Sequence, residues 1–240
     1  VLLQLGDLAI LQNEYRESDR HYTRSLEHYR AVRNRVMESI LLSRLGQLAM
    51  LTGDMAQAAA RFSDGIALSQ RTGSRFGRIS SLFDLARLDL NTGEPRRASL
   101  RFVEVTRLST EIGWHETTLI GLIFQGLAAL EMQDRELAAA ETQRAIAFWR
   151  TLSPSDFSPE YTAQCLENLA VLLAEQRPAL AARLFAAVDR AGLTDHALNT
   201  PHELAVYADA RAQVASHAPP EPVTGELSLL DALALALAVS

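Results

Sequence analysis

Lysine is missing from this 240-residue chain, and all 23 of its basic residues are arginine. A Walker A loop needs a lysine on the bound phosphates, and a Schiff-base enzyme needs a lysine amine. Neither kind of site can therefore exist in this segment. Cysteine is also scarce, because Cys165 is the only one. A single cysteine excludes an intrachain disulfide framework and suits a reducing compartment, so we expect a cytoplasmic location.

Long hydrophobic runs are absent as well. No apolar run reaches the ~18 residues of a membrane span, so we expect no membrane partner. The N-terminal stretch VLLQLGDLAILQNEY has no basic leader and no small-residue cleavage site, which argues against a signal peptide. It also lacks an initiator methionine and begins within a helical pattern, so we expect a fragment of a longer protein. The net charge of −6 argues against direct binding of nucleic acid.

Small and aromatic residues recur along the chain at a step of 40. Two positions of the step are always small: Gly6, Gly46, Ala86 and Gly126, and then Ser18, Ala58, Ala98 and Ala138. A third position holds Tyr22, Phe62, Phe102 and Thr142, and the turn pairs are Asn13-Glu14, Gly53-Asp54, Gly93-Glu94 and Gln133-Asp134. A fixed period of this length indicates a stack of helical hairpins. Because period-2 alternation is absent, we predict an all-α fold, a right-handed helical solenoid.

Helical periodicity and capping signals divide the chain into two predicted regions. Residues 1–192 should form five hairpins, pairing 1–12 with 15–33, 36–51 with 55–72, 75–91 with 95–112, 115–132 with 135–152, and 159–175 with 178–191. A loop at 151–159 interrupts the period, and Ser158 should cap the next helix. Residues 193–240 should form a C-terminal helical cap. In it, helices begin near Thr200 and Ser228, and a Pro-rich linker at 217–225 separates them.

The residues Leu45-Gly46, Ala49, Ala58 and Phe62 resemble the motif of the tetratricopeptide repeat, whose usual step is 34 residues. The longer repeat, and the segments at 181–193, 200–214 and 227–237, are similar to the C-terminal sensor region of large bacterial LuxR-type, maltose-regulator-like, ATP-dependent transcriptional regulators. In that family a nucleotide-binding module lies upstream, and a helix-turn-helix often lies downstream. The resemblance implies a sensor or interaction arm of such a regulator.

In a stack of helical hairpins, the first helices line the concave groove. The residues that should face this groove are Ile40, Ser43, Gln47, Ser80, Phe83, Arg87, Ile120, Ile123 and Leu127. They form an apolar wall with a few polar groups, a mixture that suits a peptide, a protein or an elongated small effector. Two alternatives remain open: the groove packs against another domain, or it simply faces water. An exposed Phe83 beside Arg87 would favour recognition, and a fully buried Phe83 would favour core packing.

Catalytic and metal-binding patterns are not found in the sequence. His21 and His28 share a helical face but lie ~10 Å apart by helical rise, too far to share one metal. Neither C-x-x-C nor H-E-x-x-H occurs, and His196 and His202 only flank a helix start. Cys165 lies between apolar turns, with no positive group to stabilise a thiolate. We therefore expect no enzyme activity, no metal and no cofactor.

These observations predict a non-enzymatic sensor region of a bacterial transcriptional regulator. It would bind an effector or partner in the groove and signal to upstream ATPase or DNA-binding domains of the same protein. The alternative is a stand-alone tetratricopeptide scaffold that assembles other proteins. The full-length sequence would separate the two, because a P-loop upstream or a helix-turn-helix downstream belongs only to the regulator.

Overall fold

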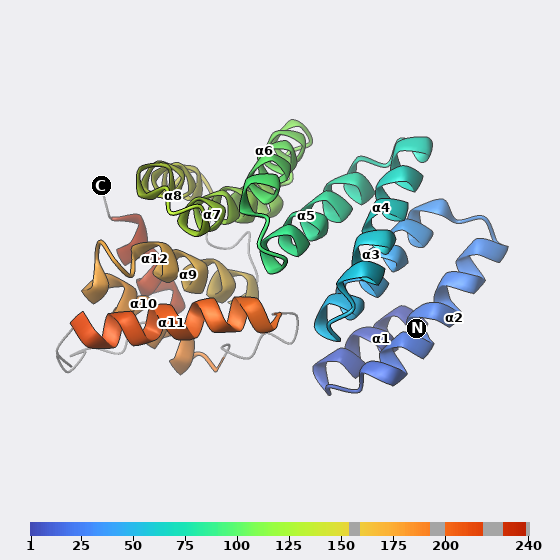
Figure 1. The fold of residues 1–240 in the computed structure, drawn as a ribbon, viewed down its shortest axis with the longest axis horizontal. Coiled ribbons are helices and arrows are strands. Elements are labelled where there is room, and N and C mark those ends of the chain that lie inside the picture. The colour runs from blue at the N-terminus through green and yellow to red at the C-terminus, as the bar shows by residue number, and fades with distance from the viewer. Residues whose placement is uncertain (154–158, 193–199, 218–227, 239–240) are drawn as a thin grey trace. The chain divides into compact units, whose positions relative to one another are not determined.

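The computed structural model describes residues 1–153, 159–192, 200–217 and 228–238 (Figure 1). Within these ranges the regular structure is helical throughout, which confirms the predicted all-α helical solenoid. The helices are α1 (Leu2–Leu11), α2 (Tyr15–Ala31), α3 (Arg35–Leu51), α4 (Met55–Thr72), α5 (Arg75–Asn91), α6 (Pro95–Glu111), α7 (His115–Glu131), α8 (Arg135–Trp149), α9 (Pro159–Leu173), α10 (Pro178–Arg190), α11 (Pro201–His217) and α12 (Leu229–Leu237). No predicted helix end is wrong by more than three residues. None of the described helices combines the length and apolar character that crossing a membrane requires.

The chain folds into two compact units. Unit 1 holds Val1–Leu108, and unit 2 holds the described residues from Ser109 onward except Thr200. Because the boundary falls inside α6, that helix belongs to both units. The predicted division at residue 192 stays a prediction. The predicted cap at Ser158 and the linker after residue 217 lie outside the described residues.

Seven turns in the first part of the chain share one backbone geometry and follow one another at intervals of 20 residues. A residue with positive φ ends each helix: Asn13, Arg33, Gly53, Gly73, Gly93, Gly113 and Gln133. In each turn, the N–H of the next residue donates to a carbonyl five residues back, as Asp54 does to Ala49 at 2.8 Å. This pattern is the Schellman ending of a helix, which glycine accommodates without steric cost. The 40-residue step therefore contains two equal half-steps.

The residue after each of these turns begins the next helix. Asn34, Asp54, Ser74 and Asp134 each accept a hydrogen bond from the backbone N–H three residues ahead. Such N-caps satisfy donors that the first helical turn leaves unpaired. Turn and cap together define where each helix ends and the next one starts, which is why the sequence predicts these ends well.

The small and aromatic residues of the repeat meet inside unit 1. A Cβ added at Gly46 would lie 2.4 Å from the Phe62 ring, and one added at Gly6 would lie 2.3 Å from the Tyr22 ring. Each glycine therefore lets α4 or α2 approach the preceding helix closely. In these two hairpins, the small and the aromatic positions of the repeat therefore pack against each other.

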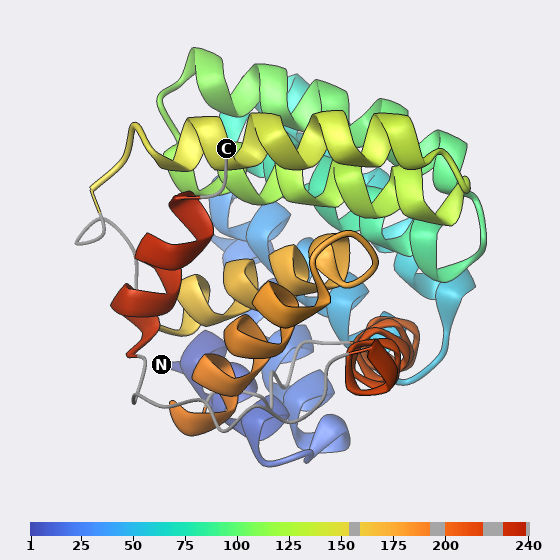
Figure 2. The same cartoon turned by 90° about the vertical axis from the view of Figure 1, so that its left-hand side faces the viewer.

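Unit 2 departs from this pattern at Gly126 on α7. A Cβ there would meet the end of Leu172, on α9, at 3.0 Å instead of an aromatic ring. The helices α9, α10 and α12 pack together, and α11 packs on α9 and α10 (Figure 2). At the start of α12, Ser228 and Asp231 form a capping box, which confirms the predicted cap at Ser228.

Candidate functional site

The nine residues predicted to face the groove lie on three helices: Ile40, Ser43 and Gln47 on α3, Ser80, Phe83 and Arg87 on α5, and Ile120, Ile123 and Leu127 on α7. The six on α3 and α5 belong to unit 1, where these two helices lie side by side, and we call this surface the inner face. On it, Ile40 is exposed, Ser43 and Arg87 are buried, and the other three are half-buried. The three residues on α7 belong to unit 2.

Asp84 on α5 brings the polar residues of the inner face together. Ser43 donates its hydroxyl to Asp84 Oδ2 at 2.5 Å. Gln47 Nε2 lies 2.9 and 3.1 Å from the two carboxylate oxygens of Asp84. Two neighbouring first helices are therefore joined by hydrogen bonds through a carboxylate that is only 3% exposed. Burial raises the pKa of Asp84, and this effect outweighs the hydrogen bonds and the nearby Arg87 and Arg44 charges, which lower it.

The same network continues from α3 to α1. Arg44 Nη1 donates to Gln47 Oε1 at 3.1 Å, and Arg44 Nε lies 3.6 Å from Asp7 Oδ1. Asp7 also accepts a hydrogen bond of 2.6 Å from the Tyr22 hydroxyl. Burial, followed by this hydrogen bond, raises the pKa of Tyr22. Polar side chains thus connect α1, α3 and α5 across unit 1.

We call this set the inner polar ladder, and its members are Asp7, Ser43, Arg44, Gln47, Asp84 and Arg87. Its two acids and two arginines balance in charge. Sequence reasoning found Ser43, Gln47 and Arg87 but missed Asp7, Arg44 and Asp84. The sequence did contain a signal for the missed residues. Two positions three residues apart are polar in the first three repeats and apolar in the fourth: Gln4 and Asp7, Arg44 and Gln47, Asp84 and Arg87, and then Phe124 and Leu127.

Phe83 lies at the edge of the inner face and is half-buried. Its ring meets that of Phe102 edge to face, with centroids 5.6 Å apart and an interplanar angle of 66°. This geometry is favourable for an aromatic pair. Phe83 is therefore neither exposed, as recognition alone would favour, nor fully buried, as core packing alone would favour.

The α7 residues of the predicted groove have different surroundings. Ile123 is completely buried in unit 2, and Leu127 and Ile120 are buried as well. Helix α9 packs against α7, with Leu172 beside Gly126. In the described chain, these apolar side chains belong to the core of unit 2 and do not form an open wall.

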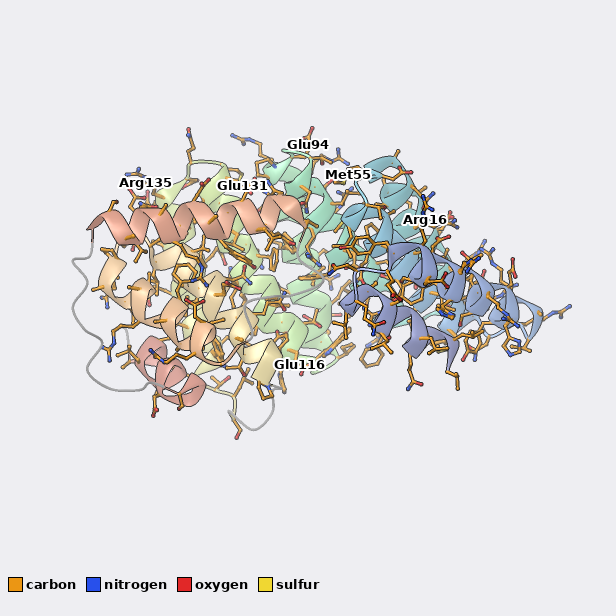
Figure 3. The ribbon with its side chains drawn as sticks, turned by 90° about the horizontal axis from the view of Figure 1, so that it is seen from below. Arg16, Met55, Glu94, Glu116, Glu131 and Arg135 are labelled. Carbon is orange, nitrogen blue, oxygen red and sulfur yellow. The ribbon has the colours of Figure 1, made fainter. Side chains whose placement is uncertain are left out.

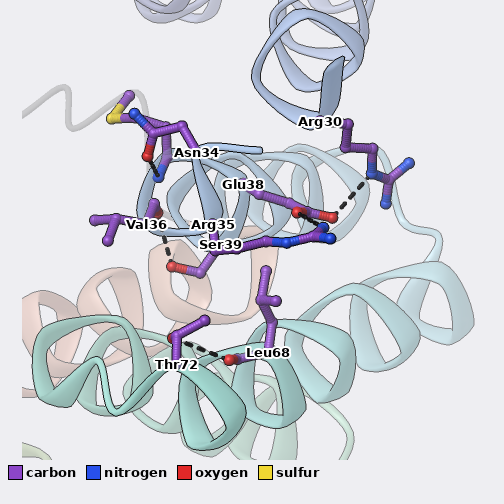
Figure 4. Close-up of polar contacts among 9 residues, drawn as sticks. Arg30, Asn34, Arg35, Val36, Glu38, Ser39, Leu68 and Thr72 are labelled. Atoms are coloured by element: carbon purple, nitrogen blue, oxygen red, sulfur yellow. Dashed lines mark hydrogen bonds and ion pairs between the residues drawn. The ribbon is translucent and has the colours of Figure 1, made fainter. Parts of the chain in front are cut away.

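A second polar cluster holds the turn between α2 and α3 (Figure 4). The buried Glu38 accepts from Arg30 Nε at 3.0 Å and from Arg35 Nη1 at 2.6 Å. Burial would raise the pKa of Glu38, but the hydrogen bonds from Arg35 and Arg30 and their charges together lower it. Both cations come from the chain itself, so this cluster stabilises the fold.

Of the residues weighed for chemistry, His202 and Cys165 belong to unit 2. His202 Nε2 lies 2.7 Å from Glu131 in unit 2, and His196 lies outside the described residues. Burial raises the pKa of the Cys165 thiol, and this effect exceeds that of the hydrogen bond with Tyr161, which lowers it. In the described parts of the chain, no three His, Cys, Asp or Glu side chains come together as metal ligands would.

Among the described residues, a cleft opens on the surface of each unit. The cleft in unit 1 has a volume of about 400 Å³, and its lining includes Arg16 and Leu48. The cleft in unit 2 has a volume of about 370 Å³, and its lining includes Leu172, Glu131 and Arg135, the last two labelled beside α11 in Figure 3. Neither cleft includes a residue predicted for the groove.

No family model matches the chain, and neither does any curated protein sequence. Solved structures do match it. BtubC (BKLC) from P. vanneervenii is 18% identical, with a TM-score of 0.62 over 93% of this chain and 84% of that one. A putative kinesin light chain with tetratricopeptide-like repeats, from Podosopora anserina, is 16% identical, with a TM-score of 0.60 over 79% of this chain and 92% of that one. The apo form of RapI is 13% identical, with a TM-score of 0.60 over 89% of this chain and 82% of that one.

These likenesses show the fold. The chain has a tetratricopeptide-like helical repeat fold, as its sequence motif at Gly46, Ala58 and Phe62 predicted. At identities of 18% and below they carry no information on what the chain binds.

Proposed function

We propose that the chain is a non-catalytic interaction region that binds a protein or peptide partner on the inner face of unit 1. The observation that carries this proposal is the inner polar ladder, which lies on the same helices as the exposed Ile40 and the half-buried Phe83. Hydrogen bonds and an ion pair join Asp7, Ser43, Arg44, Gln47 and Asp84, so these side chains are held in place before a partner arrives. A preorganised surface loses less conformational entropy on binding.

The chemistry of the inner face indicates the kind of partner. Ile40 is 36% exposed, and Gln47 and Phe83 are half-buried. The ladder charges balance, so the surface offers apolar area and amide groups without a dominant charge. Such a surface suits an extended peptide or an elongated effector with apolar side chains and backbone hydrogen-bonding groups.

A substitution at Ile40 tests this proposal. Ligands are first found by thermal shift against a panel of peptides and metabolites, and their affinity is then measured by calorimetry. Ile40→Glu should weaken binding at least ~10-fold, because it places a charge on the apolar part of the inner face. Val103→Glu is the matched control, since Val103 is an exposed apolar residue of α6. Equal affinity of the wild type and Ile40→Glu would place the binding site elsewhere.

We further propose that this region is the sensor arm of a bacterial LuxR-type, maltose-regulator-like regulator in the cytoplasm, binding an effector or partner there. The support is the 40-residue repeat together with the resemblance of the segments at 181–193, 200–214 and 227–237. The full-length coding sequence tests it. A P-loop upstream or a helix-turn-helix downstream is expected. A full-length protein with neither would overturn the regulator proposal and favour the stand-alone scaffold.

A further inference from the structure

Helix α1 carries an apolar stripe on its surface. Leu5, Leu8 and Leu11 are 39%, 48% and 65% exposed. They lie at spacings of three residues, so they share one side of the helix. We call them the α1 stripe. Three exposed leucines on a ten-residue helix are a surface that water solvates poorly.

The repeat shows what covers this stripe elsewhere in unit 1. Forty residues later, the equivalent positions on α3 are Leu45, Leu48 and Leu51. Leu45 is 3% exposed and Leu48 is 4% exposed. On α3, Leu45 and Leu48 are thus buried and Leu51 is half-buried, whereas all three leucines on α1 are exposed, although the two helices occupy the same position in the repeat.

The cover on α3 comes from α2, the second helix of the preceding hairpin. Leu45 and Leu48 belong to one apolar cluster with Tyr22 and Leu26, and Tyr15 and Tyr29 pack at its edge. The aromatic and leucine residues of α2 recur at helical spacing, so they form one stripe that meets the stripe of α3.

Helix α5 uses α4 in a related way, although its equivalent positions are Leu85, Leu88 and Asn91, of which Leu85 is half-buried and Asn91 is polar. Leu88, the equivalent of Leu48, is 4% exposed. Ser81, one helical turn before the equivalent of Leu45, is fully buried, and its hydroxyl oxygen would lie 2.5 Å from a Cβ on Gly65 of α4. In unit 1, therefore, every first helix that follows a second helix uses it to bury this side.

We propose that the α1 stripe binds an amphipathic helix of the α2 type, in the register that α2 uses on α3. Its occupant presents an aromatic residue and, four positions later, a leucine, as Tyr22 and Leu26 do. The interface continues the helix stacking already seen within unit 1. The α1 stripe contains no residue of the inner face. This proposal therefore does not depend on whether the inner face binds a partner.

A tandem variant tests this proposal in the full chain. A second copy of residues 1–40 is placed directly before Val1, so that Val1 takes the place that Leu41 has after Ile40. The added copy supplies an α2 helix in the required register, at high effective concentration. Leu8→Cys in the original copy reports the cover through its rate of reaction with a maleimide. Cys165 is completely buried and does not compete.

Leu8→Cys should react at least ~10-fold more slowly in the tandem variant than in the 240-residue chain. Leu100→Cys is the matched control: Leu100 is 73% exposed on α6, and its rate should be the same in both proteins. The far-ultraviolet circular dichroism should also gain the helical signal of the added copy. An equal rate at position 8, with the added copy folded or unfolded, would overturn the proposal.

A dilution series of the 240-residue chain shows whether a second copy of the chain covers the α1 stripe instead. If Leu8→Cys in the 240-residue chain becomes protected as protein concentration rises, and sedimentation shows a dimer, then a second copy of the chain covers the stripe. That result would also overturn the proposed occupant. A rate independent of concentration in the 240-residue chain, with protection in the tandem variant, supports it.

Discussion

Helices α3 and α7 occupy the same position in the repeat, 80 residues apart, but their inner sides are chemically opposite. Ser43 and Gln47 on α3 correspond to Ile123 and Leu127 on α7. The first pair is hydrogen-bonded to Asp84 in unit 1. The second pair is buried in unit 2, where α9 packs on α7.

The difference shows that the repeat constrains the stacking sides of a helix and leaves the inner side free to vary. Gly46 and Gly126 are both glycine because another element packs closely on each. The inner side becomes polar where neighbouring first helices join by hydrogen bonds, and apolar where a further helix covers it. Four predictions sharpen or break this contrast, and they follow in order of expected effect.

Asp84→Ala should have the largest effect. It removes the acceptor for Ser43 and Gln47 and the anion beside Arg87, so we expect a loss of roughly 3 kcal/mol in the free energy of unfolding. Chemical unfolding followed by circular dichroism measures it. Asp64→Ala, at an exposed position on α4, should change stability by less than ~0.5 kcal/mol. Similar effects of the two substitutions would contradict a structural role for the ladder.

Gly46→Ala should lower the free energy of unfolding of unit 1 by more than Gly126→Ala lowers that of unit 2. The new Cβ at position 46 would lie 2.4 Å from a rigid aromatic ring, and the one at 126 would lie 3.0 Å from the movable end of a leucine. Overpacking at position 46 should cost ~3 kcal/mol, and the higher helix propensity of alanine should return ~1 kcal/mol. For Gly46→Ala we therefore expect the free energy of unfolding to fall by roughly 2 kcal/mol. For Gly126→Ala we expect a change near zero. Thermal unfolding of both variants checks this, and the reverse order would refute it.

The stability of unit 1 should depend on pH through Asp84. Its pKa in the folded chain lies above its ordinary value of 3.8, so folding strengthens proton binding. The contribution of Asp84 to the free energy of unfolding is fully present below pH 3.8. It is lost as the pH rises through the pKa that Asp84 has in the folded chain. The wild type should therefore gain stability relative to Asp84→Asn as pH falls from 7 towards 4. Urea unfolding of both proteins over this range measures the difference, and a difference independent of pH would count against a raised pKa.

The smallest effect is expected at the turns, which are alike in both units. Arg33 in unit 1 and Gln133 in unit 2 both have positive φ, at +56° and +59°. Glycine adopts this conformation without strain, although it costs more entropy on folding. Arg33→Gly and Gln133→Gly should each stabilise the chain by about 0.5 kcal/mol. Unequal shifts in thermal midpoint would show that the two turns differ.

The sequence predicted the helices well and the inner polar ladder only in part. Helix ends follow from local signals, because glycine turns and Asn, Asp or Ser caps act on neighbouring backbone groups. The ladder depends on which side chains meet across helices. Asp84 was therefore missed, although its partners Ser43 and Gln47 had been selected. The roles of these residues in binding remain predictions.

The amino-acid sequence by itself determined the all-α repeat, its turns and the small residues at which helices pack closely. Each of these depends on backbone conformation or on the volume of one residue. Only the tertiary structure decided that Asp84 would be buried between Ser43 and Gln47, and that Ile123 and Leu127 would be core residues. A polar side chain is bonded or solvated, and an apolar one covered or exposed, according to neighbours that are distant in sequence.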